Sequence, residues 1–169
     1  GRGVVVATCN RTEIYTIAEN GEAELQALSA FFKSQFDVAM ADAEPYLFTL
    51  QQEEAVQHLF RVASGLDSLI LGESEVLGQV REAYSAATTH DSAGGTLTKL
   101  FHAALRVGKR ARTETAIGRN AMSVSRASVE TARRLLGDLR QRKALVVGVG
   151  EASKLAARAL RDAGVEWLV

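Results

Sequence analysis

The 169-residue chain carries 20 Lys and Arg against 20 Asp and Glu, so its formal net charge is zero. This length predicts one or two domains, and a hydrophobic content of 47% is enough to form a core. The single cysteine excludes an intrachain disulfide framework and favours a reducing compartment, so we expect a cytoplasmic protein. The sequence has no apolar run of about 18 residues and no signal-peptide pattern, so we expect no contact with a membrane.

Charge is distributed unevenly along the chain. Residues 1–98 carry 5 Lys and Arg against 14 Asp and Glu, a balance of −9, and residues 99–169 carry 15 against 6, a balance of +9. A cationic half of this kind can contact nucleic acid, or it can simply cover the solvated faces of long helices. Both interpretations stay open on charge alone.

The first fifty residues alternate between strand-like and helix-like patterns. We expect strands over 4–6 and 12–18, joined by a turn at 9–11, then a helix over 22–36 and a short strand over 46–50. The order strand, strand, helix, strand is the larger part of a split βαβ sandwich of the ferredoxin-like type, without its opening strand and helix.

From residue 53 onward the pattern is helical, and then it changes again. Apolar spacing predicts helices over 53–63, 76–88, 97–113 and 123–136. Residues 118–120 look like a hinge, which gives domains of residues 1–117 and 118–169. Residues 143–169 combine an apolar strand, a Gly-x-Gly turn, a helix and the start of a second strand. We therefore predict an α/β protein, with an α+β domain followed by the start of a Rossmann-type domain.

The glycine turn reads Gly148-Val149-Gly150-Glu151-Ala152-Ser153. In a dinucleotide-binding turn the first glycine permits a tight bend, the second lets the backbone approach the pyrophosphate, and the third position is small. Ser153 is small but is not glycine. Because the turn follows an apolar strand and opens a helix, it fits a dinucleotide site, although a tight turn that binds nothing has the same pattern.

Cys9 lies in a polar turn rather than in an apolar segment. A lone cysteine is often a small apolar residue of the core. Here its neighbours are Thr8, Asn10 and Arg11, which supply donors and acceptors at a turn, and a cation within reach favours the reactive thiolate. These neighbours favour a nucleophile. His58, on its predicted helix, can be an ordinary partner for Glu54 or Arg61.

Three stretches in order, "TCNRTEIY", "ASGLDSLILGE…LGQV" and the glycine turn, resemble the glutamyl-tRNA reductase family over nearly the whole chain. The first two are highly specific to that family, whereas the glycine turn is not. The resemblance implies NADPH-dependent reduction of glutamyl-tRNA(Glu) to glutamate-1-semialdehyde through a cysteine thioester, the first step of tetrapyrrole synthesis. It also implies a homodimer, a downstream aminomutase as a further partner, and family segments outside this sequence: an N-terminal strand and helix, the rest of the NADPH domain and a C-terminal dimerisation domain.

The resemblance also assigns roles to individual residues. Cys9 would be the nucleophile, and His58 matches a histidine that the family needs for activity. Arg11 would form a bidentate contact with a carboxylate. The implied substrate-binding residues are Thr8, Asn10, Arg11, Ser68, Glu73, Ser74, Glu75 and Gln79, and the implied NADPH-binding residues are Gly148, Val149, Gly150, Glu151, Ala152 and Ser153. No metal ligands are implied.

Two departures from the family pattern affect these assignments. The family commonly has Gly-Glu-Pro-Gln where this chain has Gly72-Glu73-Ser74-Glu75, so the loop lacks a proline and Glu75 adds a negative charge near an anionic substrate. A family serine is replaced by Ala7, which removes one hydrogen-bonding group near the thiol.

Two other functions account for parts of the sequence. A thiol-dependent reductase of an acyl-CoA or acyl phosphate would also use a cysteine and a nicotinamide, but it does not account for the loop "SGLDSLILGE" or the basic second half. A non-catalytic dinucleotide-binding module would have an inert Cys9. Slow labelling of Cys9 by iodoacetamide, at the rate of a free thiol, would favour the module.

Overall fold

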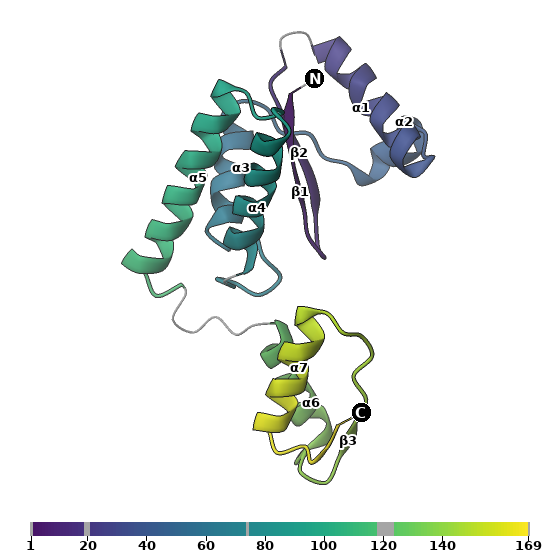
Figure 1. Ribbon diagram of the computed structural model, residues 1–169, viewed down its shortest axis with the longest axis vertical. Coiled ribbons are helices and arrows are strands. Elements are labelled where there is room, and N and C mark those ends of the chain that lie inside the picture. The colour runs from purple at the N-terminus through teal and green to yellow at the C-terminus, as the bar shows by residue number, and fades with distance from the viewer. Residues whose placement is uncertain (1, 19–20, 74, 118–123, 169) are drawn as a thin grey trace.

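The computed structural model describes residues 2–18, 21–73, 75–117 and 124–168 (Figure 1). The elements that precede residue 115 (the first group) and those that follow residue 123 (the second group) are described in turn (Figure 1). The hinge predicted over 118–120 lies outside the described residues. Helices and small sheets are combined, so the predicted α/β class is confirmed.

An antiparallel hairpin forms the centre of the first group. β1 (Gly3–Ala7) pairs with β2 (Thr12–Thr16), and the register places Val4 opposite Tyr15 and Val6 opposite Glu13. Val4 and Val6 are completely buried whereas Val5 is exposed, as expected where successive side chains of a strand point to opposite faces. One face of the hairpin therefore faces the core.

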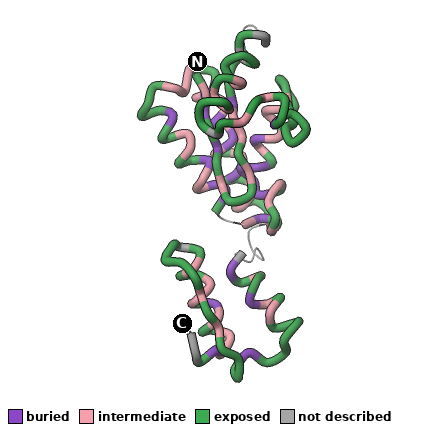
Figure 2. The backbone as a smooth tube through the Cα atoms, turned by 90° about the vertical axis from the view of Figure 1, so that its right-hand side faces the viewer, coloured by how far each residue is buried: buried purple, intermediate pink, exposed green. Residues whose placement is uncertain are grey.

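Three helices supply the rest of that core: α3 (Glu53–Ala63), α4 (Glu75–Thr89) and α5 (Gly95–Glu114). α4 packs on β1, and α5 packs on both α3 and α4, so buried residues gather between the helices and the hairpin (Figure 2). The buried cluster consists of Val4, Val6, Tyr15, Leu59, Val62, Ala63, Val76, Leu77, Val80, Ala87, Leu97, Phe101 and Ala104. Gly108 allows the close approach of α5 to α3, because a Cβ there would collide with the carbonyl oxygen of Ala63.

The short strand predicted over 46–50 is wrong. α1 (Gly21–Phe36) and α2 (Met40–Ala43) lead instead into a 3-10 helix, η1 (Glu44–Tyr46), and residues 47–50 have no regular structure. Pro45 lies in the first turn of η1, where its fixed φ and missing N–H suit a helical start. In the described part of the chain β2 pairs with β1 alone, so the expected third strand of the sandwich is not formed.

The second group is a small strand–helix–strand unit with one additional helix. α6 (Val124–Leu136) packs on α7 (Glu151–Asp162), and β3 (Lys143–Ala144) pairs in parallel with β4 (Trp167–Leu168). Gly137 follows the last residue of α6: its φ is +75° and its N–H donates to the carbonyl of Arg133 at 2.9 Å.

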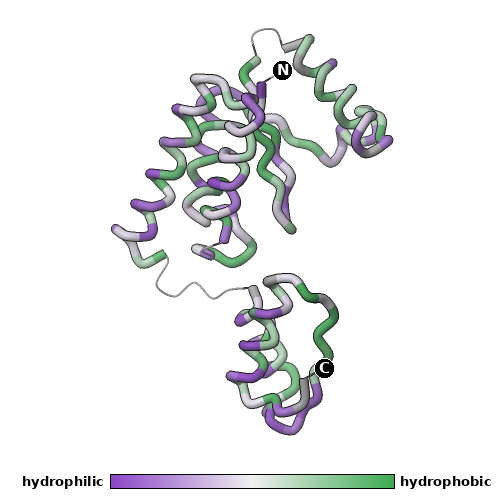
Figure 3. Tube along the Cα trace, viewed as in Figure 1, coloured by the Kyte–Doolittle hydropathy of each residue, from purple (hydrophilic) through white to green (hydrophobic). Residues whose placement is uncertain are grey.

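The apolar strand that leads to the glycine turn is shorter than predicted. It ends at Ala144, and residues 145–149 have no regular structure although they are among the most hydrophobic of this group (Figure 3). Val147 is 86% exposed. Strands of parallel sheets are normally buried on both faces, and among the described residues only β4 pairs with β3. A search of the described helices finds none with the length and apolar character needed to cross a bilayer.

Candidate active site

Cys9 lies at the tip of the β1–β2 hairpin and is exposed. The backbone N–H of Thr8 donates to the carbonyl of Arg11 at 2.8 Å, and the N–H of Asn10 donates to the Thr8 hydroxyl at 3.2 Å. These bonds fix the turn without using the thiol. The cysteine is therefore exposed on a hydrogen-bonded turn and does not belong to the apolar core, and its role as a nucleophile stays a prediction.

Glu13 is the centre of a hydrogen-bond network beside this turn. Its carboxylate accepts from Arg11 Nη1 at 3.0 Å and from the Tyr15 hydroxyl at 2.6 Å, and it contacts His58 Nε2 at 2.8 Å. The Glu13 side chain is only 10% exposed, so these bonds form in a partly dry environment. The contact suits a proton on Nε2 of His58 that is donated to the Glu13 carboxylate, because an ionised carboxylate can only accept.

Arg11 is held by two acidic residues. Besides Glu13, Nη1 contacts Asp67 Oδ2 at 3.0 Å, and Nη2 donates to the backbone carbonyl of Asp67. The Arg11 side chain is 11% exposed. No hydrogen bond joins Arg11 to Cys9 in the described structure. The contacts of the guanidinium hold the loop that contains Asp67 and do not engage the thiol.

Tyr15 completes the network from inside the core. Burial is the largest influence on the Tyr15 hydroxyl, followed by its hydrogen bond to Glu13, and together they raise the pKa of Tyr15 far above its usual range. The hydroxyl is therefore a neutral donor under all physiological conditions. The Tyr15 ring packs edge-on against Phe101, with 5.4 Å between ring centroids, and this contact anchors the network to α5.

The loop between α3 and α4 has a conformation that depends on glycine. Gly65 and Gly72 have φ of +73° and +77°, and the N–H of Gly72 donates to the carbonyl of Gly65 at 2.9 Å. A Cβ on Gly72 would collide with the backbone of Ile117. The loop is also held from α5, because Arg112 Nη1 donates to the carbonyl of Glu73 at 2.7 Å.

Ser68 lies in this loop directly after Asp67. Its hydroxyl oxygen is buried and has no hydrogen-bond partner among the described residues. A buried hydroxyl without a partner is unusual and costs free energy. The hydroxyl therefore has unused hydrogen-bonding capacity in the loop that contains Asp67, and the substrate contact predicted for Ser68 stays a prediction.

The other predicted substrate residues are less closely connected to the network. Glu75 is exposed at the start of α4, Gln79 is half-buried on the same helix, and Glu73 is half-buried in the loop. Within the described ranges no side-chain hydrogen bond links these three residues to Glu13 or Arg11. Ser74 lies outside the described residues.

The glycine turn leads directly into α7, as predicted. Gly148 has a φ of +124°, and a Cβ there would lie 2.9 Å from the Ser153 hydroxyl, so the turn requires glycine at this position. Gly150 is the residue before the helix, Val149 and Ala152 are exposed, and the backbone of Glu151 begins α7. A glycine turn that opens a 12-residue helix is the local geometry on which the predicted NADPH contact depends.

Four residues of the site were not predicted from the sequence: Glu13, Tyr15, Asp67 and Phe48. The spacing of Arg11, Glu13 and Tyr15 was a usable signal: Glu13 and Tyr15 lie two apart on β2 and share a face, and Arg11 directly precedes the strand. Asp67 lies 56 residues from its partner Arg11, and no local pattern joins the two. The Phe48 ring packs edge-on against His58, with centroids 5.6 Å apart, from a segment that was predicted to be a strand.

The chain is similar to known proteins over nearly its whole length. The family described as "Glutamyl-tRNAGlu reductase, N-terminal domain" matches residues 2–115. The "Glutamyl-tRNA reductase" of Moorella thermoacetica is 50% identical over 163 residues, which cover 96% of this chain and 37% of that protein. The protein of the same name from Pelotomaculum thermopropionicum is 45% identical over 165 residues, which cover 98% of this chain and 37% of that protein.

A solved structure, "Glutamyl-tRNA Reductase from Methanopyrus kandleri", superposes with a TM-score of 0.61 at 39% sequence identity. The match covers 99% of this chain and 39% of that chain. The chain thus spans well under half the length of the proteins it matches.

Proposed function

The chain belongs to the glutamyl-tRNA reductase family, and on that premise we propose that it contains the catalytic centre of an enzyme that reduces glutamyl-tRNA(Glu) to glutamate-1-semialdehyde with NADPH. The observation that carries the proposal is the exposed thiol of Cys9, on a turn fixed by backbone bonds, beside the network of Arg11, Glu13 and His58. The family further suggests a cytoplasmic homodimer that passes its aldehyde to a downstream aminomutase.

The first chemical step is an acyl transfer to Cys9. The thiolate sulfur attacks the carbonyl carbon of the glutamyl ester, a carbon–sulfur bond forms, and the bond to the ribose oxygen of the tRNA breaks. One proton leaves the thiol, and one proton must reach the departing ribose oxygen. His58 is the histidine that the Glu13 network positions, and we assign this proton transfer to it.

The glutamyl group would be recognised by Arg11 and Ser68. The planar guanidinium of Arg11 matches a carboxylate, but in this structure Asp67 already contacts both of its terminal nitrogens. A substrate carboxylate would therefore replace the contacts with Asp67. The unpartnered hydroxyl of Ser68, the next residue in the same loop, would gain its missing hydrogen bond at the same time.

The glycine turn would hold NADPH through its pyrophosphate. Gly148 and Gly150 would allow the backbone to approach the phosphates, and the first N–H groups of α7 would donate to them. When bound, the cofactor supplies the hydride that converts an acyl thioester to an aldehyde. The task of this chain's residues is to hold the thioester on Cys9 and to keep the glutamyl group oriented.

The experiment that tests the proposal uses an enzyme with the full length of its relatives. NADPH oxidation and aldehyde formation should both occur with glutamyl-tRNA(Glu) and should be absent with glutamyl-CoA or glutamyl phosphate. Activity with the latter substrates alone would support the acyl-CoA or acyl-phosphate reductase. No aldehyde from any of the three, together with slow labelling of Cys9 by iodoacetamide, would support a non-catalytic module.

The tRNA partner suggests a role for the cationic face of α5. Lys99, Arg106 and Lys109 are exposed, follow one another at helical spacing and have no side-chain partner among the described residues. Two other cations that share this helix are already engaged: Arg110 makes two hydrogen bonds to Glu114, and Arg112 donates to the carbonyl of Glu73. Unpaired cations are the better candidates for contacts with tRNA phosphates.

The neighbours Lys109 and Arg110 make a matched pair for testing this surface. Lys109→Ala should lower tRNA affinity and flatten the dependence of log affinity on log salt by about one unit or less, because one phosphate contact and its counterion release are lost. Arg110→Ala should change the slope less, because Arg110 is paired with Glu114. Filter binding across a range of salt concentrations measures both slopes. An unchanged slope in Lys109→Ala would mean that this face only solvates the helix.

A further inference from the structure

We infer that Phe48 forms a stacking site for the terminal nucleobase of the aminoacyl-tRNA, directly beside the reactive centre. The inference rests on the proposed function, because it identifies which part of the substrate lies next to His58. It concerns the nucleoside side of the ester, whereas Arg11 and Ser68 concern the amino-acid side.

Phe48 is an exposed aromatic residue held in a defined place. It is 68% exposed, yet its ring packs edge-on against the ring of His58, with centroids 5.6 Å apart and an interplanar angle of 75°. Residues 47–50 belong to no helix or strand, so Phe48 reaches His58 from an irregular segment that runs between η1 and α3. Because only a small part of the ring is buried, most of its surface is open to a ligand.

The position of Phe48 relative to the network is what suggests a nucleobase. His58 Nε2 lies 2.8 Å from Glu13, which binds Arg11 at 3.0 Å, and Arg11 follows Cys9 in the hairpin turn. The Phe48 ring is therefore in direct contact with His58, the residue to which we assign the proton transfer. In an aminoacyl-tRNA the ester and the last base are attached to the same ribose. A base must consequently lie within one nucleotide of the attacked carbonyl.

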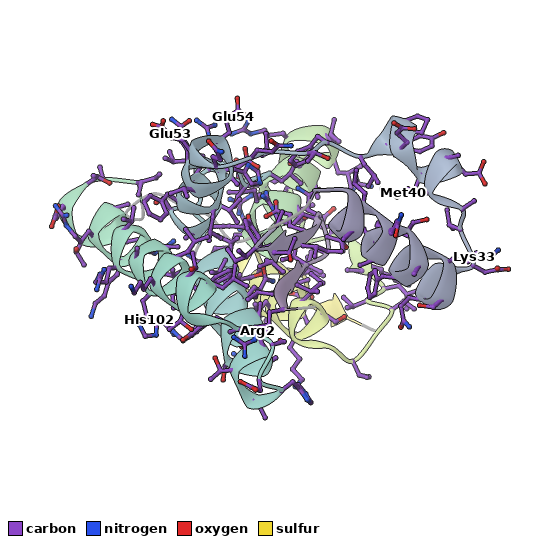
Figure 4. All side chains as sticks on the ribbon, turned by 90° about the horizontal axis from the view of Figure 1, so that it is seen from above. Arg2, Lys33, Met40, Glu53, Glu54 and His102 are labelled. Atoms are coloured by element: carbon purple, nitrogen blue, oxygen red, sulfur yellow. The ribbon has the colours of Figure 1, made fainter. Side chains whose placement is uncertain are left out.

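An aromatic ring suits such a base for a physical reason. The last nucleotide of a tRNA is unpaired, and proteins bind unpaired bases chiefly by stacking them on aromatic side chains. The charges that flank this segment favour a neutral base over a phosphate. Glu44 is exposed on one side of Phe48, and Glu53 and Glu54 are exposed at the start of α3, where they project outward (Figure 4). Carboxylates at both ends of the segment would repel a phosphate group.

Tyr46 provides an internal comparison. It lies two residues away, is 87% exposed, and makes no ring contact with His58 or with any other described aromatic residue. If exposure of an aromatic residue alone bound the base, Tyr46 would serve as well as Phe48. Only Phe48 combines an open ring with contact to the reactive network.

The test uses the full-length enzyme and two esters that differ only in their alcohol: 2′(3′)-O-glutamyl-adenosine and the ethyl ester of the glutamate α-carboxyl group. The rate of acylation of Cys9 by each ester is followed by intact-protein mass. Phe48→Leu keeps an apolar contact with His58 but removes the flat ring, so acylation by glutamyl-adenosine should fall roughly tenfold, within the range known for loss of one base stack. Acylation by the ethyl ester should fall by a much smaller factor, because that ester has no base to stack on the ring. Phe48→Tyr and the control Tyr46→Leu should both behave like the unmodified enzyme.

Two outcomes would overturn the inference. An equal loss with both esters would show that Phe48 only supports His58, and no loss with either ester would show that the base binds elsewhere. Failure of the proposed function is separable from both: the unmodified enzyme would then not be acylated on Cys9 even by glutamyl-tRNA itself.

Discussion

Replacement of Cys9 by serine should abolish both the reduction of glutamyl-tRNA and the release of free glutamate from it. Serine has nearly the same shape as cysteine, and the bonds that fix the hairpin turn come from Thr8, Asn10 and Arg11, so the fold should be retained. A hydroxyl without a positioned base is a far weaker nucleophile than a thiolate. We expect the rate of either reaction to fall by about three orders of magnitude or more, as is typical when a covalent nucleophile is removed.

The two reactions can be separated by leaving out the cofactor. Without a hydride donor, a glutamyl thioester on Cys9 can react only with water or another nucleophile, so the unmodified enzyme should slowly release glutamate from glutamyl-tRNA without forming aldehyde. The measurement is release of labelled glutamate with and without NADPH, in the unmodified enzyme and in Cys9→Ser. An unchanged Tm would confirm that the variant is folded. If Cys9→Ser released glutamate at the full rate, Cys9 would have no part in the mechanism.

The elements that local sequence patterns predict best are those stabilised by local contacts. The hairpin of β1 and β2 and the helices α3 to α5 lie close to their predicted positions, because period-2 and helical spacing already define their buried faces. The prediction fails where a segment depends on a distant partner. Residues 46–50 and 145–147 are apolar enough for strands, but a strand forms only beside another strand, and in the described structure neither segment has one there.

The candidate site likewise has a part that depends on neighbours in sequence and a part that depends on distant residues. The exposed turn that carries Cys9 could be predicted, because its neighbours are polar and adjacent in sequence. The contacts of the network with distant residues could not, since His58 lies 45 residues from Glu13 and Asp67 lies 56 residues from Arg11. The structure also changes the interpretation of Arg11. The sequence suggested a cation that favours the thiolate, whereas in the structure Arg11 forms ion pairs with Glu13 and Asp67.

Arg11→Lys should therefore impair the enzyme far more than conservation of charge suggests. The guanidinium uses Nη1 for the carboxylates of Glu13 and Asp67, and Nη2 for the backbone carbonyl of Asp67. The ammonium of lysine is a single compact donor group and cannot reproduce this planar arrangement, nor can it hold a substrate carboxylate through two parallel bonds. We expect kcat/KM for glutamyl-tRNA to fall by about 100-fold, on the basis of two lost charge-assisted hydrogen bonds.

Arg61→Lys is the matched control, because Arg61 approaches the same Asp67 carboxylate from α3. Its guanidinium lies 3.9 Å from Asp67 and is 54% exposed, so this pair is weak and screened by solvent. Arg61→Lys should change kcat/KM by less than about fivefold, since exposed pairs contribute at most about 1 kcal/mol. The separation of kcat from KM then identifies what Arg11 does. A rise in KM points to lost recognition of the glutamyl carboxylate, whereas a fall in kcat with unchanged KM points to a misplaced Glu13 and His58. Turnover by Arg11→Lys within a few-fold of the unmodified enzyme would show that the planar contact has no function in catalysis.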